Sequence, residues 1–567
     1  MCSSDLTLRP CRDKSKDWDT TQNLYIEGDN LEALKILRET YQGKVKLIYI
    51  DPPYNTGHDF IYADDFSQSR EDYDARSGDY DDEGGRLVAN PESNGRFHSD
   101  WCSMMYPRLM LARDLLSKDG AIFISIDDCE VANLSKVCNE VFGTGNALAV
   151  FHRVTKKSSN SGDNFSPCMD YLLGYARDIT CIKEFSVPMP EEIRARYVLK
   201  DQYWSERGPY QEVGLFQAAL KHGGSTYPIV CPDGERVIPP NGQPWRWNAK
   251  AFELGSQEGR IVFKRSDRTG LLDADTGSRA HWNVYTKVYL KEREAKGMHP
   301  KNFSDAFQNT LASNELKKLD IPFDFAKPST LVQYLINLVC LEEDCVLDFF
   351  SGSATTAHAV MKQNAEDGGH RKFILVQLPE ECAEGSEAYK AGYRTICDIG
   401  EERIRRAGDK IAAEVEESNR QLELGAEPKP VPDIGFRVLR VDDSCLKDQR
   451  LTPEETGQLS LDSLIDNSVE GTTSLDLLFQ VLPAFRIPYS EKIEERQIGG
   501  CTVYDVGEGQ LLACFDEGIS SQVIEAIAKQ RPPYAVFRDA ALADDATAAN
   551  LEELFKTYSP DTVRKVI

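Results

Sequence analysis

One stretch of this chain combines residue types that suit the binding of a planar ring carrying an amine. It reads LIYIDPPYNTG over residues 47–57, so that an apolar run ends in Asp51, two prolines and Tyr54. Proline has a fixed φ and no N–H, so the backbone is stiff here and the Pro52 carbonyl cannot be taken up by a helix. Two acceptors beside an aromatic face fit a nucleobase drawn out of a duplex. The alternative is that the prolines only end a strand and that Tyr54 packs in a core.

A second stretch has the composition of a ligand-binding turn. It reads VLDFFSGSATTAHA over residues 346–359, where Gly352 and its small neighbours permit close approach of a ligand to the backbone. The amides of a following helix N-terminus can receive an anionic group. No Gly-Lys-Ser/Thr follows, so this is not a phosphate-binding P-loop, and the absence of G-x-G-x-x-G disfavours NAD. Glycine-containing turns between strand and helix also occur in sheets that bind no ligand.

Both stretches follow predicted buried strands, and strands alternate with helices around them. This alternation predicts an α/β fold with a mainly parallel sheet covered on both faces, whose ligands bind beyond the carboxyl ends of the strands. A helix is expected from Asp100 to a closing turn at Asp119-Gly120. Strands are expected at Val45–Asp51, Ala121–Asp127, Asp170–Ala176, around 345–349 and around 372–377, and helices over 30–42, 130–143, 355–365 and 395–418.

The length of 567 residues and changes in composition predict several domains. Residues 183–320 are rich in Pro, Gly and Trp and interrupt the alternation, which indicates a separate irregular domain. The polar, proline-bearing residues 419–433 are typical of a linker. A third region of mixed α and β structure is expected from Ile434 onward.

Charge is distributed unevenly along the chain. The formal net charge is −26, but residues 151–320 contain 25 Lys+Arg and 21 Asp+Glu, a net of +4, so the remainder carries −30. One acid-rich segment lies at Tyr62–Gly85. The middle third is therefore the only broad region suited to a polyanion. A solvated surface loop would give the same count.

Several classes of protein are disfavoured by simple patterns. The 15 cysteines include no C-x-x-C pair and no Cys/His cluster with zinc spacing, so we expect reduced thiols in a cytosolic protein and no metal site. No apolar run is long enough to span a membrane, and the N-terminus does not resemble a signal peptide.

The two stretches together closely resemble the amino-methyltransferases of DNA, which transfer methyl from S-adenosylmethionine to an exocyclic amine. The catalytic motif precedes the cofactor motif here, as in the permuted β class of these enzymes. FAKPSTLVQYLI, residues 325–336, looks like the helix before the cofactor strand of the family. Residues 95–128, 395–411 and 536–567 resemble the modification subunit of type III restriction systems.

The resemblance implies a catalytic set and a cofactor set. The usual F-x-G-x-G of the cofactor turn has Ala354 in place of its second glycine, and the acid for the ribose hydroxyls is either near Gln377 or at Glu380. The implied catalytic residues are Asp51, Pro52, Pro53 and Tyr54, and the implied cofactor-binding residues are Lys327, Pro328, Asp348, Phe350, Ser351, Gly352, Ser353, Thr355, Thr356, Gln377 and Glu380.

The resemblance also implies the architecture and the partners. It implies a doubly wound, circularly permuted methyltransferase sheet over 1–180 and 321–420, an inserted DNA-recognition domain over 181–320, and an α+β C-terminal domain over 434–567 that contacts partners. We expect a cytoplasmic bacterial or archaeal homodimer that binds duplex DNA and works with an ATP-dependent helicase–nuclease subunit. This chain has no P-loop and is expected not to hydrolyse ATP.

In the implied reaction, a flipped adenine stacks on Tyr54 and its N6 amine donates to Asp51 and to the Pro52 carbonyl. Asp at position 51 favours adenine N6 over cytosine N4. Three alternatives stay open: a stand-alone DNA methyltransferase, cytosine N4 specificity, and a non-catalytic DNA-recognition subunit. Candidates for reading DNA are Lys156, Lys157, Arg246 and the group Phe263–Arg268, whereas Trp245–Trp247 is expected to be local core.

Overall fold

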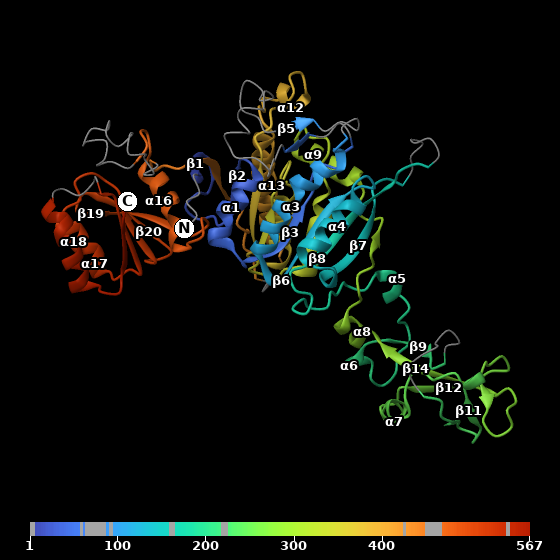
Figure 1. Ribbon diagram of the computed structural model, residues 1–567. Coiled ribbons are helices and arrows are strands. Elements are labelled where there is room, and N and C mark those ends of the chain that lie inside the picture. The colour runs from blue at the N-terminus through green and yellow to red at the C-terminus, as the bar shows by residue number, and fades with distance from the viewer. Residues whose placement is uncertain are drawn as a thin grey trace. The chain divides into compact units, whose positions relative to one another are not determined.

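The chain divides into two compact units. A computed structural model describes residues 6–56, 60–62, 87–89, 95–157, 165–216, 225–422, 427–447, 468–539 and 545–567. The first unit comprises Met1–Lys183 with Lys301–Ile567, and the second comprises Glu184–Pro300 (Figure 1). Apart from Tyr62, the acid-rich segment Tyr62–Gly85 lies outside the described residues.

A ten-stranded sheet dominates the first unit, in the order β1-β18-β2-β17-β16-β3-β6-β8-β7-β15. From β18 to β6 each strand is parallel to the next, β1 and β8 run antiparallel to their neighbours at the two sides, β7 pairs antiparallel with β8, and β15 pairs parallel with β7. The strands span Leu6–Lys16 (β1), Leu24–Glu27 (β2), Val45–Ile50 (β3), Leu116–Ile126 (β6), Ala147–Val154 (β7), Met169–Ala176 (β8), Phe303–Ser304 (β15), Cys345–Asp348 (β16), Lys372–Gln377 (β17) and Phe436–Asp443 (β18).

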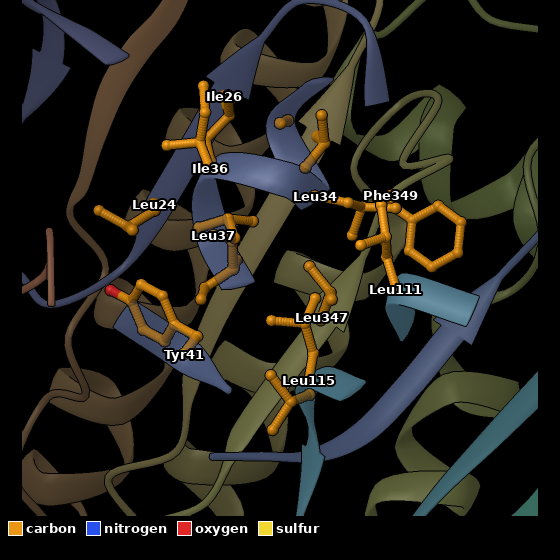
Figure 2. Close-up of a cluster of buried hydrophobic side chains, with 14 of the residues drawn as sticks. Leu24, Ile26, Leu34, Ile36, Leu37, Tyr41, Leu111, Leu115, Leu347 and Phe349 are labelled. Atoms are coloured by element: carbon orange, nitrogen blue, oxygen red, sulfur yellow. The ribbon is translucent and has the colours of Figure 1, made fainter. Parts of the chain in front are cut away.

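Helices cover both faces of this sheet, which explains why its central strands are mainly apolar. The helices are α1 (Asn30–Tyr41), α3 (Phe97–Leu115), α4 (Val131–Phe142), α9 (Asn309–Leu319), α10 (Ser329–Val339), α11 (Thr355–Asp367), α12 (Glu387–Lys390) and α13 (Ile396–Arg420). On one face, leucines of α1 and α3 pack against Leu24, Leu347 and Phe349 (Figure 2). The alternate strand residues Leu47 and Val346 are equally buried but belong to the other face, where α10 and α11 lie against β3, β16 and β17.

The region around Asp119-Gly120 differs from the sequence prediction. The expected helix ends at Leu115, and Asp119-Gly120 lies within β6 rather than in a closing turn. The pairing of β3 with β6 shifts between Val45/Leu116 and Leu47/Ala121, so the intervening residues form a bulge. The Lys46 ammonium binds the Asp119 carboxylate, and Ser117 Oγ donates to it at 2.9 Å, which holds the bulge in the strand.

The second unit is built from short strands around its own small core. Leu215, Ile229, Trp245 and Val284 are buried there, and Trp245 donates through Nε1 to the Tyr227 carbonyl at 2.7 Å. Its elements are α5 (Glu191–Arg194), α6 (Trp204–Arg207), β9 (Tyr210–Gly214), β10 (Ile229–Val230), β11 (Arg236–Ile238), α7 (Ala249–Gln257), β12 (Ile261–Arg265), β13 (Leu272–Asp273), β14 (Trp282–Tyr289) and α8 (Leu290–Lys296). Residues 301–320, which the sequence placed with this insertion, instead contribute β15 and α9 to the first unit.

The C-terminal part of the first unit carries a five-stranded sheet in the order β19-β20-β21-β22-β23. Its elements are α16 (Ser474–Val481), β19 (Ile493–Ile498), β20 (Cys501–Val506), β21 (Leu511–Cys514), α17 (Ser521–Lys529), β22 (Tyr534–Phe537), α18 (Asp545–Tyr558) and β23 (Val563–Val566). The sequence placed the start of this domain at residue 434, but β18 at 436–443 pairs with β1 and β2 in the large sheet. Among the described helices, none is both long enough and apolar enough to cross a membrane.

Candidate active site

Asp51, Pro52, Pro53 and Tyr54 leave the carboxyl end of β3 as a rigid loop. The Tyr54 hydroxyl donates to Asp51 Oδ1 at 2.9 Å. Trp101, fully buried in α3, donates through Nε1 to the Pro53 carbonyl at 2.8 Å. Among the described residues, no donor reaches the Pro52 carbonyl. The loop therefore presents one carboxylate and one uncommitted carbonyl beside the Tyr54 ring.

Lys327 occupies this acceptor group. Its ammonium donates to both carboxylate oxygens of Asp51, at 2.7 and 2.6 Å, and lies 4.8 Å from the centroid of the Tyr54 ring. Burial and the neighbouring Asp51 charge raise the pKa of Tyr54 well above its ordinary value, so the ring remains a neutral phenol. The sequence placed Lys327 with the cofactor, whereas its ammonium contacts the catalytic motif.

A buried carboxylate behind the loop was not predicted from the sequence. Asn55 follows Tyr54 in the left-handed conformation, with φ 60°, and its amide donates to Glu130 Oε1 at 2.7 Å. Glu130 is fully buried at the start of α4. His98 Nδ1 lies 2.5 Å from the same oxygen, and Asn133 donates to Oε2 at 2.9 Å. Asparagine tolerates a positive φ better than most residues do. Asn55, directly after the predicted motif, was therefore the sequence signal that the chain turns here.

The turn after β16 is closed by Asp348. Its carboxylate accepts from the Phe350 backbone N–H at 3.1 Å and from the Thr356 hydroxyl at 2.6 Å. Burial raises the pKa of Asp348 to about 7. The first bond closes the turn locally, and the second, across eight residues, ties the strand end to the first turn of α11.

Gln377 also supports this turn. Its Oε1 accepts from the Gly352 backbone N–H at 2.7 Å, and its Nε2 donates to the Leu378 carbonyl at 3.1 Å. Both ends of the amide are therefore committed within the protein. Gln377 and Glu380 are the two residues considered for binding the ribose hydroxyls. Of these, Glu380 is the one whose side chain is still available.

Three acceptors near the ends of β2, β16 and β17 lack hydrogen-bond partners among the described residues. Glu380 is partly buried, and burial raises the pKa of its carboxyl. The Ser351 hydroxyl is buried without a hydrogen-bond partner. Asp29 Oδ2 is also buried and accepts no hydrogen bond from the described residues, but it lies 3.8 Å from the Arg108 guanidinium, whereas Asp29 Oδ1 caps α1. Asp29 was not predicted, although an aspartate directly before the predicted helix at 30–42 is a helix start signal that could have indicated it. These atoms, together with Gly352, form a set able to receive a polar ligand.

The predicted DNA-reading residues do not belong to one unit. Lys156 and Lys157 lie in the first unit, where the Lys157 ammonium pairs with Asp305 at 2.9 Å. Arg246 and the group Phe263–Arg268 lie in the second, where Lys264 pairs with Glu212 and Arg265 pairs with Asp233 at 3.0 Å. Trp245 is core, as expected.

Fold and site together define an α/β protein with an amine-accepting aromatic loop and a glycine turn on neighbouring parallel strands. The model of the DNA methylase family matches residues 45–405. The chain belongs to this family, whose name refers to methylation at N6 and N4.

The curated relatives are methyltransferases and modification subunits. The Mod subunit of the type III enzyme StyLTI of Salmonella typhimurium is 36% identical over 71% of this chain and 59% of its own length. The Mod subunit of the type III enzyme EcoPI of Escherichia phage P1 is 31% identical over 81% of this chain and 70% of its own length. The type II methyltransferase M.KpnI of Klebsiella pneumoniae is 30% identical over 69% of this chain and 89% of its own length. The chain thus spans less than two thirds of the StyLTI subunit.

Two solved structures are more distant. The PvuII cytosine-N4-specific DNA methyltransferase is 12% identical, covers 68% of this chain and 94% of its own, and has a TM-score of 0.30. The M1.HpyAVI–SAM complex is 12% identical, covers 67% of this chain and 98% of its own, and has a TM-score of 0.27.

Proposed function

We propose that this chain is the modification subunit of a type III restriction system and methylates adenine N6 in duplex DNA with S-adenosylmethionine. The observation that carries the proposal is the Lys327 ammonium, held by Asp51 over the Tyr54 ring. It stands in for the amine of a target base, because it is a nitrogen donor bound by a carboxylate beside an aromatic face. Relatives named as type III Mod subunits support the assignment.

A flipped adenine fits the loop in the following way. Its ring stacks on Tyr54, and its amine displaces the Lys327 ammonium from Asp51. The Asp51 carboxylate and the Pro52 carbonyl accept hydrogen bonds from the two N–H groups of the amine. These hydrogen bonds localise the nitrogen lone pair, which would otherwise be delocalised into the ring. Positioning and hydrogen bonding of this kind supply most of the catalysis, so Asp51 need not be a strong base.

The residues of the glycine turn fit the cofactor. The free Ser351 hydroxyl and the Glu380 carboxylate offer the acceptors that ribose hydroxyls and an amine need, and the Gly352 backbone can be approached closely. When bound, S-adenosylmethionine supplies an electrophilic methyl group. Asp348 and Gln377 instead stabilise the turn itself, by hydrogen bonds to Phe350, Thr356 and Gly352. Pro328 follows Lys327 directly and is the N-cap residue of α10.

The first test measures methyl transfer from labelled S-adenosylmethionine to mixed-sequence duplex DNA, followed by digestion to nucleosides. We expect N6-methyladenine with the wild type and none with Asp51→Ala. Asp128→Ala, an exposed acid after the neighbouring strand β6, is the matched control and should retain activity. Label in cytosine would overturn the choice of base. Cofactor binding without any transfer would favour a recognition subunit.

The remaining parts of the proposal concern the assembly. We infer a homodimer in the cytoplasm that associates with an ATP-dependent helicase–nuclease subunit for cleavage, by analogy with relatives named as subunits of restriction-modification enzymes. Light scattering during size-exclusion chromatography tests the dimer. A mass equal to one chain of 63.7 kDa at micromolar concentration would contradict it.

A further inference from the structure

Ala354 in the glycine turn has an unfavourable backbone conformation. Its φ of 63° and ψ of 41° lie in the left-handed region, and it is the N-cap of α11. For a residue with a Cβ this region costs about 1–2 kcal/mol, whereas glycine adopts it freely. Ala354 is also fully buried. Something around the turn must therefore favour this conformation over the extended or right-handed alternatives.

Arg403 of α13 contacts the residues on both sides of Ala354. Its Nη1 donates to Ser353 Oγ at 2.8 Å, to the Ser353 carbonyl at 3.3 Å and to Thr355 Oγ1 at 2.8 Å. One helical turn earlier, Gly400 lets α13 approach closely: a Cβ there would lie 3.2 Å from the Gly352 carbonyl oxygen. Helix α13 thus packs closely against the turn at Gly352 and hydrogen-bonds to it at Ser353 and Thr355.

Stability alone does not explain an arginine at this position. Arg403 is fully buried, and its Nε and Nη2 find no hydrogen-bond partner among the described residues. Burial lowers the pKa of its guanidinium to about 10. The nearest carboxylate oxygen, Glu315 Oε2, is 3.9 Å from Nη2 and already accepts from the Ser329 backbone N–H, while Oε1 accepts from the Ser329 hydroxyl. An apolar residue of similar size would avoid the cost of burying this charge.

We propose that Arg403 is a positioning residue that keeps Ala354 left-handed and so holds the Ser351–Thr355 turn in the shape that receives S-adenosylmethionine. The inference rests on the proposed function for the identity of the ligand. It explains how this chain tolerates alanine where the family pattern has glycine. A glycine at 354 would adopt the same conformation without the hydrogen bonds that Arg403 makes to Ser353 and Thr355.

A double-mutant cycle tests this coupling. Binding of S-adenosylhomocysteine is measured by calorimetry for the wild type, Arg403→Met, Ala354→Gly and the double variant, with thermal unfolding as the check on folding. We expect Arg403→Met to weaken binding about tenfold, which corresponds to 1.4 kcal/mol. Ala354→Gly should bind at least as tightly as the wild type, and the double variant should regain most of the loss. In methyl transfer, Arg403→Met should raise KM for the cofactor more than it lowers kcat.

Arg406→Met is the matched control, because Arg406 lies on the same helix and binds the Leu319 and Asp320 carbonyls away from the turn. Its affinity should equal that of the wild type. Should Arg403→Met fail to fold, Arg403→Lys takes its place in the cycle, with a smaller loss and the same rescue. Additive effects in a folded set would overturn the inference while leaving the proposed function intact. Absence of binding by the wild type would instead overturn the proposed function.

Discussion

At the scale of single residues, the two motifs differ in how far their polar groups are hydrogen-bonded within the protein. The carboxylate of Asp51, which we propose to be catalytic, is fully engaged by the Lys327 ammonium and by the Tyr54 hydroxyl. On the other side, Ser351 in the glycine turn and Glu380 after β17 have side chains without hydrogen-bond partners among the described residues, whereas Asp348 is committed to the turn. In the proposed reaction, an incoming base thus has to displace a protein cation, while polar groups of the cofactor meet acceptors that are not hydrogen-bonded to the described residues.

Asp348 makes a prediction about pH. Its pKa is raised to about 7 by burial, against about 3.9 in an unfolded chain. Between these values the folded state binds more protons than the unfolded state, so stability that is fully present below pH 4 is lost as the pH rises through 7. Asp348→Asn removes this dependence. From pH 5 to pH 8, the free energy of unfolding of the wild type should fall by about 2–3 kcal/mol relative to the variant, as measured by urea titration.

Glu343→Gln serves as the control, because Glu343 is exposed two residues before the same strand. Its difference from the wild type should stay constant over this pH range. An equal slope for the wild type and Asp348→Asn would show that Asp348 is already ionised in the folded protein at pH 5.

At the scale of elements, the loop after β3 is held in place by helices that lie far away in the sequence. Trp101 of α3 binds the Pro53 carbonyl, and Glu130 at the start of α4 binds Asn55. The loop is thereby held at its third and fifth positions, which leaves Asp51 and Pro52 to face a ligand. On the cofactor side, α13 plays the corresponding part through Gly400 and Arg403.

Removing the Glu130 carboxylate should loosen the catalytic loop. Glu130→Ala removes the acceptor of the Asn133 amide and of the buried Asn55 amide. Leaving a buried amide without an acceptor typically costs about 1–3 kcal/mol. We expect a corresponding loss in the free energy of unfolding and a fall of about tenfold or more in kcat for methyl transfer. Cofactor affinity should stay near that of the wild type.

The exposed Glu140 on the same helix provides the comparison, and Glu140→Ala should behave as the wild type in both measurements. The account fails if Glu130→Ala is destabilised but keeps full kcat, because the carboxylate would then support the fold without positioning the loop.

At the scale of the whole molecule, the catalytic and cofactor motifs share one unit, although 276 residues separate Asp51 from Lys327. The intervening unit Glu184–Pro300 has its own core. Its two ends are joined by an antiparallel bridge, in which Val187 N–H donates to the Met298 carbonyl at 2.8 Å and Met298 N–H donates back at 3.1 Å. Chain entry and exit are therefore close together.

This closeness allows the second unit to be removed. Joining Lys183 to Lys301 through a short Gly-Ser linker should leave the first unit folded, since its sheet and core lie outside the excised residues. We expect calorimetry to show S-adenosylhomocysteine binding within about threefold of the wild type. Methylation of duplex DNA should be lost, because the excised unit is the proposed reader of sequence. Methylation at the wild-type rate would exclude that role.

Much of the architecture follows from local patterns. The apolar runs at 45–50, 345–348 and 372–377, separated by helical periodicity, predict parallel strands, and the prolines at 52 and 53 mark where the first must end. The structure agrees with these elements. It differs where a local signal was overruled by a distant partner. Asp119-Gly120 is read as a turn from its own residues, but Lys46 and the β3 pairing hold it in β6.

The sequence by itself determined the residue types at the two strand ends and hence the kind of ligand each can bind, since carboxylate, carbonyl and ring are local properties. Only the tertiary structure decided which groups are already occupied. Lys327 binds Asp51, Gln377 binds Gly352, and Arg403 flanks Ala354 across 49 residues of chain. The physical reason is that hydrogen bonds and burial depend on neighbours in space, and the parallel sheet brings together side chains whose spacing along the chain carries no signal of contact.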